Sequence, residues 1–202
     1  MSTSPPNRPR RLRTEIPKPL DSALVASLSE ADLGLRRGVV ALAAPSPRWA
    51  QAFTGVANAL DVNWPAGIRA IEHIGSTAVP GLAAKPILDL AIGFEPAANL
   101  DRIHHWLLSL GFLCLGEKDA YRPDLMYGFE IEPGIRLVNA HAIEHGSTEW
   151  TGYLAFRNYL RTHPVERDAY GALKRSVALQ NPGDRIGYLA GKAEFIRARR
   201  AR

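Results

Sequence analysis

Residues Ile71 to Ile92 read IEHIGSTAVPGLAAKPILDLAI, and they carry the strongest local signals in this chain. An apolar strand runs into Gly75-Ser76-Thr77, and Pro80-Gly81 marks a second turn. Lys85 then precedes a proline, which favours extended backbone at the entry to the next apolar strand. The stretch therefore predicts two strands joined by a loop over residues 75–85.

The second strand has two different faces. Side chains alternate between the faces of a strand, so Leu88 and Leu90 share one face and Asp89 points to the other. The leucine face predicts a core layer. Asp89 must then face a cleft or a second layer, because an unpaired acid inside a core is costly.

The loop itself predicts anion binding. Gly75 lets the backbone approach a ligand closely, and Ser76 and Thr77 add hydroxyls beside backbone N–H groups that bind phosphate oxygens. Lys85, between loop and strand, is a candidate phosphate contact. The alternatives are that the hydroxyls only cap a short helix, and that Lys85 is a surface residue or closes a salt bridge with Asp89.

The full string HIGSTAVPGLAAKPILDL, residues 73–90, resembles the signature of the GrpB-like family, a branch of the nucleotidyltransferase superfamily. The resemblance covers roughly residues 33–198. It implies an α+β fold with a nucleotidyltransferase-like mixed sheet, flanking helices and a C-terminal helical segment. Further matching blocks are SPRWAQAF (46–53), HAIEHGSTEW (141–150) and LAFRNYLR (154–161).

The resemblance implies transfer of a nucleotidyl or phosphoryl group from a nucleoside triphosphate to an unknown acceptor. In the superfamily, carboxylates on the strand after the Gly-Ser turn hold Mg²⁺, which here implies Asp89 as metal ligand and Asp89, Lys85 and His141 as catalytic residues. The superfamily pattern places a second acid two residues after the first, and this chain has Ala91 there. A noncatalytic nucleotide- or phosphate-binding module and a structural partner domain are the alternatives.

One carboxylate with waters and substrate phosphates still suffices for a single Mg²⁺. A further ligand could come from a later strand, where Asn139 and His141 share a face, or from the strand that carries Glu130 and Glu132. The resemblance favours His141, because the family has a histidine at that place. Asn139 is a candidate substrate contact.

Three more residues are candidate substrate contacts. His73 precedes the glycine turn, where the alternative is a hydrogen-bonded structural histidine. Arg157 and Arg161 lie four residues apart on a predicted helix, so they share a face. They are either surface charges or line the site entrance to meet an anionic substrate.

The domain organisation is an Arg- and Pro-rich arm over residues 1–20, expected to be disordered, and one domain over 21–202 with a helical tail over 148–202. Trp49, Phe53 and Trp150 are expected in the core. The predicted elements before the tail are helices at 29–34, 47–60 and 100–110 and strands at 39–43, 69–74, 87–92, 112–115, 126–131 and 135–143. The inward residues predicted for the last two helices are Ala169, Leu173, Val177, Ile186, Leu189 and Ala193, with Phe195 and Ile196 near the end of the last helix.

Charge and composition bound the partners. The chain has 202 residues and a net charge of +5, but the first 20 residues carry +4 and the last six another +4, so the body carries −3. Nucleic acid is therefore not expected as a partner except through the basic ends. A phosphorylated small molecule is the expected partner, and a protein partner stays open. The sequence has no run of 18 apolar residues, so a membrane span is not expected. The single cysteine, Cys114, is consistent with the reducing cytoplasm, which is the expected location.

Overall fold

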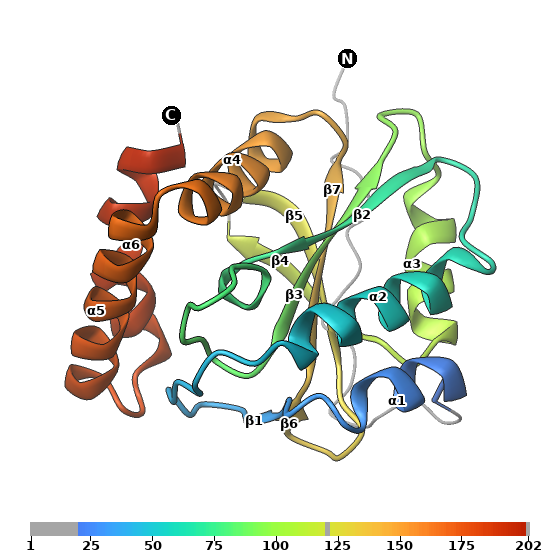
Figure 1. The fold of residues 1–202 in the computed structure, drawn as a ribbon. Helices are drawn as coiled ribbons and strands as arrows, with labels where there is room; N and C mark the ends of the chain where they lie inside the picture. The colour runs from blue at the N-terminus through green and yellow to red at the C-terminus, as the bar shows by residue number, and fades with distance from the viewer. Residues whose placement is uncertain (1–19, 120–121, 201–202) are drawn as a thin grey trace.

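The computed structural model describes residues 20–119 and 122–200. Its centre is a mixed five-stranded sheet in the order β2-β3-β7-β5-β4 (Figure 1). Strand β3 runs parallel to β7, and the other neighbouring pairs are antiparallel, so the predicted mixed sheet is confirmed. The strands are β2 (Ile68–Ile74), β3 (Leu88–Phe94), β4 (Leu113–Asp119), β5 (Arg122–Phe129) and β7 (Val138–Glu144).

Two groups of helices lie on opposite sides of this sheet (Figure 1). The second group follows β7 in the chain, and the first helix of that group packs on the sheet at β2 and β7. The helices predicted for the C-terminal segment are thus present. The first group is α1 (Ser22–Leu28), α2 (Arg48–Asp61) and α3 (Leu100–Ser109); the second is α4 (Thr148–Thr162), α5 (Pro164–Gln180) and α6 (Arg185–Arg200).

The main core lies between the first helix group and the sheet. Leu88 and Leu90 of β3 are fully buried in it, as the alternation predicts. Trp49 of α2 is buried in the same cluster, and Phe53 one turn later packs against it. Both residues were predicted as core from their helical spacing, and burial of such large rings supplies much of the hydrophobic stabilisation.

The opposite face of the sheet changes character along β3. Ala91 is fully buried in a small apolar cluster with Ile74, Ile143 and Trp150, which confirms the core assignment of Trp150. Asp89 lies two residues earlier on the same face, where the cluster ends. This face therefore has an apolar end under α4 and a polar end near the start of β3.

The N-terminal elements differ from the prediction. The helix expected at 29–34 is instead α1, which begins after Asp21, whose side chain accepts a hydrogen bond from the Leu24 N–H. The strand expected at 39–43 is reduced to a bridge between Ala43 and Ala84. The predicted arm, residues 1–20, lies outside the described residues except for Leu20, which packs against the core.

The strand predicted over 135–143 is two strands in two sheets. Strand β6 (Ile135–Arg136) pairs with β1 (Leu35–Arg36) in a separate two-stranded sheet, and β7 enters the main sheet. The break follows from tertiary pairing, since no Gly or Pro interrupts residues 135–143. It brings the segment after β1 close to the polar end of the main sheet.

The inward faces of α5 and α6 also differ from the prediction. Val177 is buried as expected, and Leu173, Phe195 and Ile196 pack against buried clusters. Ala169, Ile186 and Leu189, by contrast, are exposed. The buried positions are instead Tyr170 and Lys174 on α5 and Tyr188 on α6. Tyrosine and lysine bury long apolar bodies while directing a polar tip elsewhere, so counting only aliphatic residues misplaced the faces.

Across the described residues, no helix combines the length and the apolar character that a membrane crossing requires.

Candidate functional site

The turn after β2 is built on a glycine. Gly75 has φ 70° and ψ −168°, a conformation that side chains other than glycine's rarely adopt, and the 3-10 helix η1 (Ser76–Ala78) follows it. A Cβ atom at this position would lie 2.4 Å from the Asp89 Oδ2 atom. The glycine therefore lets the turn sit directly against the carboxylate of the next strand.

Asp89 faces away from the main core, as strand alternation predicts. Its register partner on β7 is Asn139, whose Nδ2 donates a 2.9 Å hydrogen bond to Asp89 Oδ1. The Nε2 atom of His141 lies 4.0 Å from the same oxygen. The Asp89 side chain is 33% exposed and that of His141 only 4%, so the carboxylate stays accessible to a ligand.

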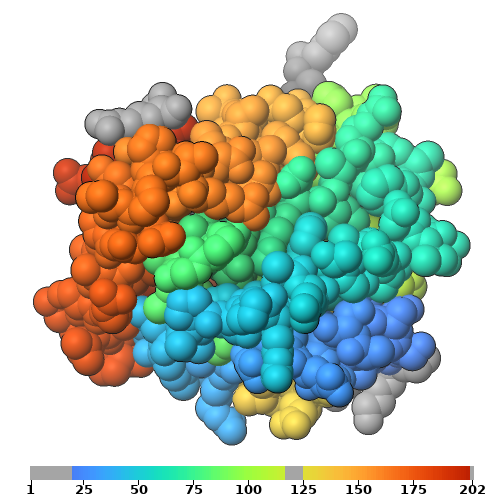
Figure 2. Space-filling view, in the orientation of Figure 1, coloured from blue at the N-terminus to red at the C-terminus, as the bar shows by residue number. Residues whose placement is uncertain are grey.

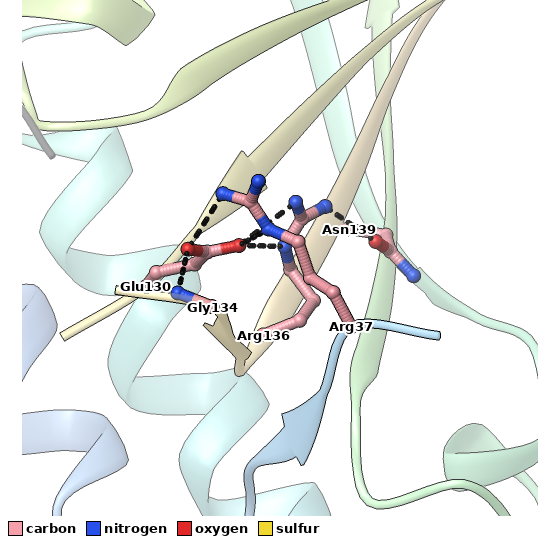
Figure 3. A network of polar contacts seen from close by, with 5 residues as sticks. All are labelled: Arg37, Glu130, Gly134, Arg136 and Asn139. Atoms are coloured by element: carbon pink, nitrogen blue, oxygen red, sulfur yellow. Dashed lines mark hydrogen bonds and ion pairs between the residues drawn. The ribbon is translucent and has the colours of Figure 1, made fainter. Parts of the chain in front are cut away.

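Asn139 is itself fixed from the other side (Figure 3). Its Oδ1 accepts a 3.2 Å hydrogen bond from Arg136 Nη1, so its amide nitrogen must face Asp89. Arg136 in turn donates to Glu130, which also binds Arg37 and the backbone N–H of Gly134. A chain of contacts thus runs from the segment after β1 to the carboxylate of Asp89.

The Glu130 carboxylate is saturated by this network (Figure 3). Burial alone would raise its pKa, but the hydrogen bonds from Arg37, Gly134 and Arg136 hold the pKa below its ordinary value. Glu132 is exposed beyond the end of β5. Neither acid is thus available beside Asp89, although the sequence left both open as further metal ligands.

A small cavity of about 60 Å³ lies between the turn, the start of β3 and helix α6. It brings together four residues that the sequence singled out: Ser76, Thr77, Lys85 and Asp89. In the space-filling view, the green β2–β3 connection reaches the surface beside the orange C-terminal helices (Figure 2). The remaining lining residues are Ala84, Ile87, Tyr188 and Lys192.

Tyr188 and Lys192 are the cavity residues that sequence reasoning did not assign to the site. Both lie on α6, four residues apart and hence on one helix face. The Nζ atom of Lys192 lies 4.6 Å from the centre of the Tyr188 ring, and that of Lys85 lies 4.5 Å from it. The spacing of four residues predicts that Tyr188 and Lys192 share a helix face. No local pattern, however, predicts that this face lies beside Lys85.

Burial shifts the acidity of both aromatic and cationic groups here. It lowers the pKa of Lys85 to about 8, with Arg185 lowering it further and Asp89 opposing the shift. It also raises the pKa of Tyr188 to about 12, with Asp89 adding to the shift. At neutral pH Lys85 is therefore largely protonated and Tyr188 is a neutral phenol.

Helix α5 supports the loop from beneath. Lys174 is buried and its Nζ donates to the carbonyl oxygen of Ala83, while Tyr170 hydrogen-bonds with Ser76. Burial and the nearby Lys192 charge lower the pKa of Lys174 to about 6, so the amine is largely neutral at pH 7. Lys174 does not line the cavity.

The three other candidate substrate contacts hold structure together and do not line the cavity. Arg157 Nη1 donates to Glu72 Oε2 at 2.6 Å and to the His73 carbonyl oxygen at 2.8 Å, which ties α4 to β2. Arg161 Nε donates to the Ala78 carbonyl oxygen at 2.9 Å, which ties α4 to η1.

His73 lies on the other face of the sheet from Asp89, because its register partner is Leu90. Its Nε2 is 3.0 Å from Thr77 Oγ1, and its ring stacks on Phe53. Burial lowers its pKa to about 4, with Arg161 and Arg157 adding to the shift and Asp89 opposing it. The ring is therefore neutral at pH 7 and lies between Phe53 and Thr77, an arrangement that fits the hydrogen-bonded structural histidine.

The side chains at this site fit a metal ion only together with a bound phosphate ligand. Among residues 20–119 and 122–200, no group of three or more His, Cys, Asp or Glu side chains is arranged to hold a metal. Asp89 supplies one carboxylate, and Mg²⁺ is commonly held by one or two carboxylates with substrate phosphates and waters. The residues thus suit a magnesium–phosphate complex better than the free ion.

The fold and the site together define an α+β protein in which a turn, a lysine and a partly exposed aspartate surround an anion-sized cavity. Comparison with known proteins then identifies the family: the model described as GrpB protein matches residues 39–202, and the chain belongs to this family. The expected GrpB resemblance is confirmed.

A solved structure, the conserved protein GrpB from Enterococcus faecalis, superposes with a TM-score of 0.70 at 31% identity, covering 80% of this chain and 95% of that one. The glutamate-rich protein GrpB of Alkalihalophilus pseudofirmus is 26% identical over 81% of this chain and 95% of its own length. The protein YqkA of Bacillus subtilis is 32% identical, but the match spans only 43% of it. A dephospho-CoA kinase of Mycolicibacterium paratuberculosis is 30% identical over 81% of this chain and 46% of its own length.

Proposed function

We propose that the chain is a nucleotidyltransferase-like protein that transfers a nucleotidyl or phosphoryl group from a nucleoside triphosphate to an acceptor. The observation that carries the proposal is that Ser76, Lys85 and Asp89 line one cavity. The turn offers backbone N–H groups and a hydroxyl to phosphate oxygens, and Lys85 offsets negative charge there. The cytoplasm, with its nucleotides and magnesium, is the proposed compartment.

Asp89 is the proposed ligand for Mg²⁺, which when bound would neutralise phosphate charge and orient the reacting group. Asn139 keeps the carboxylate turned toward the cavity. In the reaction, an acceptor lone pair forms the new bond to phosphorus. The bond from phosphorus to the bridging oxygen breaks with its electron pair, which leaves with pyrophosphate or a nucleoside diphosphate. His141, beside Asp89, is the candidate base for the acceptor's proton.

The relatives support the class of ligand without naming the acceptor. Dephospho-CoA kinase is by name a phosphoryl-transfer enzyme, and the matched segment is about half of that protein. The name therefore supports a phosphorylated small molecule as ligand, while the rest of that enzyme lies outside the match.

A second function is favoured by Ala91. It stands where the superfamily pattern has its second acid, and it is fully buried against Trp150 and its neighbours. A carboxylate would have to displace that apolar cluster. The site thus also suits a noncatalytic module that binds a nucleotide or phosphate, or a domain that steadies a protein partner.

Thermal denaturation separates these functions, because a ligand that binds only the native state raises its stability. The chain would be heated with each nucleoside triphosphate, with and without Mg²⁺, as wild type, as Asp89→Asn, and as Asp61→Asn, an exposed control at the end of α2. Transfer chemistry requires a magnesium-dependent rise in Tm that Asp89→Asn loses and Asp61→Asn keeps. A rise that ignores magnesium indicates the binding module, and no rise with any triphosphate contradicts both.

A further inference from the structure

We propose that helix α6 completes the binding site, and that Tyr188 and Lys192 join Lys85 to form a pocket for the terminal phosphate group of the ligand. The inference rests on the proposed function and deepens it, because it assigns the ligand's phosphate end to a particular set of side chains. It also makes the C-terminal helix part of the recognition machinery.

The first support is the arrangement of the two amines. Lys85 comes from the loop before β3 and Lys192 from α6, yet both Nζ atoms lie within 4.6 Å of the Tyr188 ring centre and both line the cavity. Tyr188 is itself only 2% exposed, so its ring is a fixed surface close to both amines. An aromatic face attracts a cation, which helps to hold each amine at the cavity that all three residues line.

The second support is charge. Burying Lys85 costs energy through lost hydration, and the lowered pKa of Lys85 reflects that cost. Arg185, on the first turn of α6, adds to it. Lys192 brings a second amine to the same cavity. Asp89 is the single carboxylate among the lining residues. A bound phosphate dianion would offset the excess positive charge.

The third support is size. Sites that enclose a whole small-molecule ligand usually measure about 300–1,000 Å³, whereas this cavity measures about 60 Å³. It therefore suits one phosphate-sized head group. The rest of a nucleotide must lie outside it, so recognition depends on an accessible terminal phosphate and not on the nucleoside.

The test uses inorganic tripolyphosphate, which presents terminal phosphates without a nucleoside, alongside ATP and adenosine. Calorimetric titration of the full chain should detect tripolyphosphate and ATP with similar Kd values, and adenosine not at all. The variant Lys192→Gln should weaken tripolyphosphate binding about tenfold or more, as expected for losing a charged contact. Lys192→Arg should stay within a few-fold of wild type, because it keeps the charge.

Arg197→Gln is the matched control, since it removes one positive charge from an exposed position of the same helix. It should leave tripolyphosphate binding unchanged within about twofold, because exposed distant charges are screened by salt. Circular dichroism would verify folding, and Lys192→Met, which keeps the apolar stem over Tyr188, carries the same expectation if Lys192→Gln does not fold.

The outcomes separate this inference from the proposed function. If Lys192→Gln binds tripolyphosphate as wild type does, α6 is not part of the pocket. If adenosine binds and tripolyphosphate does not, the cavity does not take a phosphate. In either case a magnesium-dependent ATP response that is lost in Asp89→Asn would leave the proposed function standing.

Discussion

Glu130 and Asp89 are two acids on the same side of one sheet, and their surroundings are opposite. Glu130 is fully buried and is bound by two arginine side chains and a backbone N–H group. Asp89 is one third exposed; it accepts a hydrogen bond from the neutral amide of Asn139, and His141 Nε2 lies 4.0 Å from it. The first acid has its charge balanced by the fold, whereas the second keeps an accessible carboxylate that a cation or ligand can meet.

The two acids are also connected. Arg136 contacts both Glu130 and Asn139 (Figure 3). Asn139 in turn contacts Asp89. The ion network around Glu130 therefore orients the side-chain amide of Asn139, so that its Nδ2 donates to the Asp89 carboxylate. A substitution at Glu130 should therefore lower the stability of the fold, and it should also alter the orientation of the Asp89 side chain.

The largest effect is expected from Glu130→Gln. Removing one partner of a buried ion network typically costs about 3–5 kcal/mol, and here Arg136 would stay buried without its compensating charge. Urea denaturation would measure the free energy of unfolding. Glu132→Gln, an exposed neighbour, should change it by less than about 0.5 kcal/mol. Equal effects at both positions would show that the network does not carry the stability assigned to it.

The next largest loss of stability is expected from Gly75→Ala, which places a methyl group against Asp89. The unusual backbone alone costs about 1–3 kcal/mol, and the contact with Asp89 Oδ2 adds to it. Gly146→Ala is the matched control, because Gly146 has φ 80° but no heavy atom within 4 Å of a built Cβ. Denaturation should show a larger loss at 75 than at 146, and identical losses would argue against the close approach.

Acidification should act on Glu130 through its lowered pKa. The folded pKa lies below the unfolded value of about 4.3, so the stabilisation is complete above the unfolded pKa and is lost as the pH falls through the folded pKa. Thermal melts between pH 7 and pH 2 should show a steeper loss for the wild type than for Glu130→Gln. Parallel profiles would mean that Glu130 has an ordinary pKa in the folded chain.

The smallest effect on stability is expected from Asp89→Asn. The carboxylate is partly solvated and the substitution preserves its shape, so the free energy of unfolding should change by about 1 kcal/mol or less. The same variant should lose the magnesium-dependent response to triphosphate. A loss of stability as large as that of Glu130→Gln would place Asp89 with the structural acids.

Local patterns predicted the centre of the fold well. Rules that act within a few residues predict the Gly75 turn and the alternating faces of β3. They also predict that Asn139 and His141 share one face of their strand. These rules also explain why Asp89 leaves the core layer. The apolar helix face around Trp49 was predicted for the same reason.

The rest depends on contacts between distant segments. Arg37 reaches Glu130 across 93 residues, and no local pattern specifies that pair. The buried face of α6 is chosen by its packing against α4 and α5 and against Val40, which buries Tyr188 and leaves the more apolar Ile186 exposed. The split of the strand at 135–143 likewise comes from pairing with β1.

The position of β7 has a consequence for how the chain acquires its site. Asp89 and Asn139 are 50 residues apart in sequence, and β7 lies between β3 and β5 in the finished sheet. Contacts between distant segments form late because closing long loops costs entropy. Refolding followed by tripolyphosphate binding and by tryptophan fluorescence should therefore give one common rate, since the strand that completes the sheet also delivers the amide that orients the carboxylate.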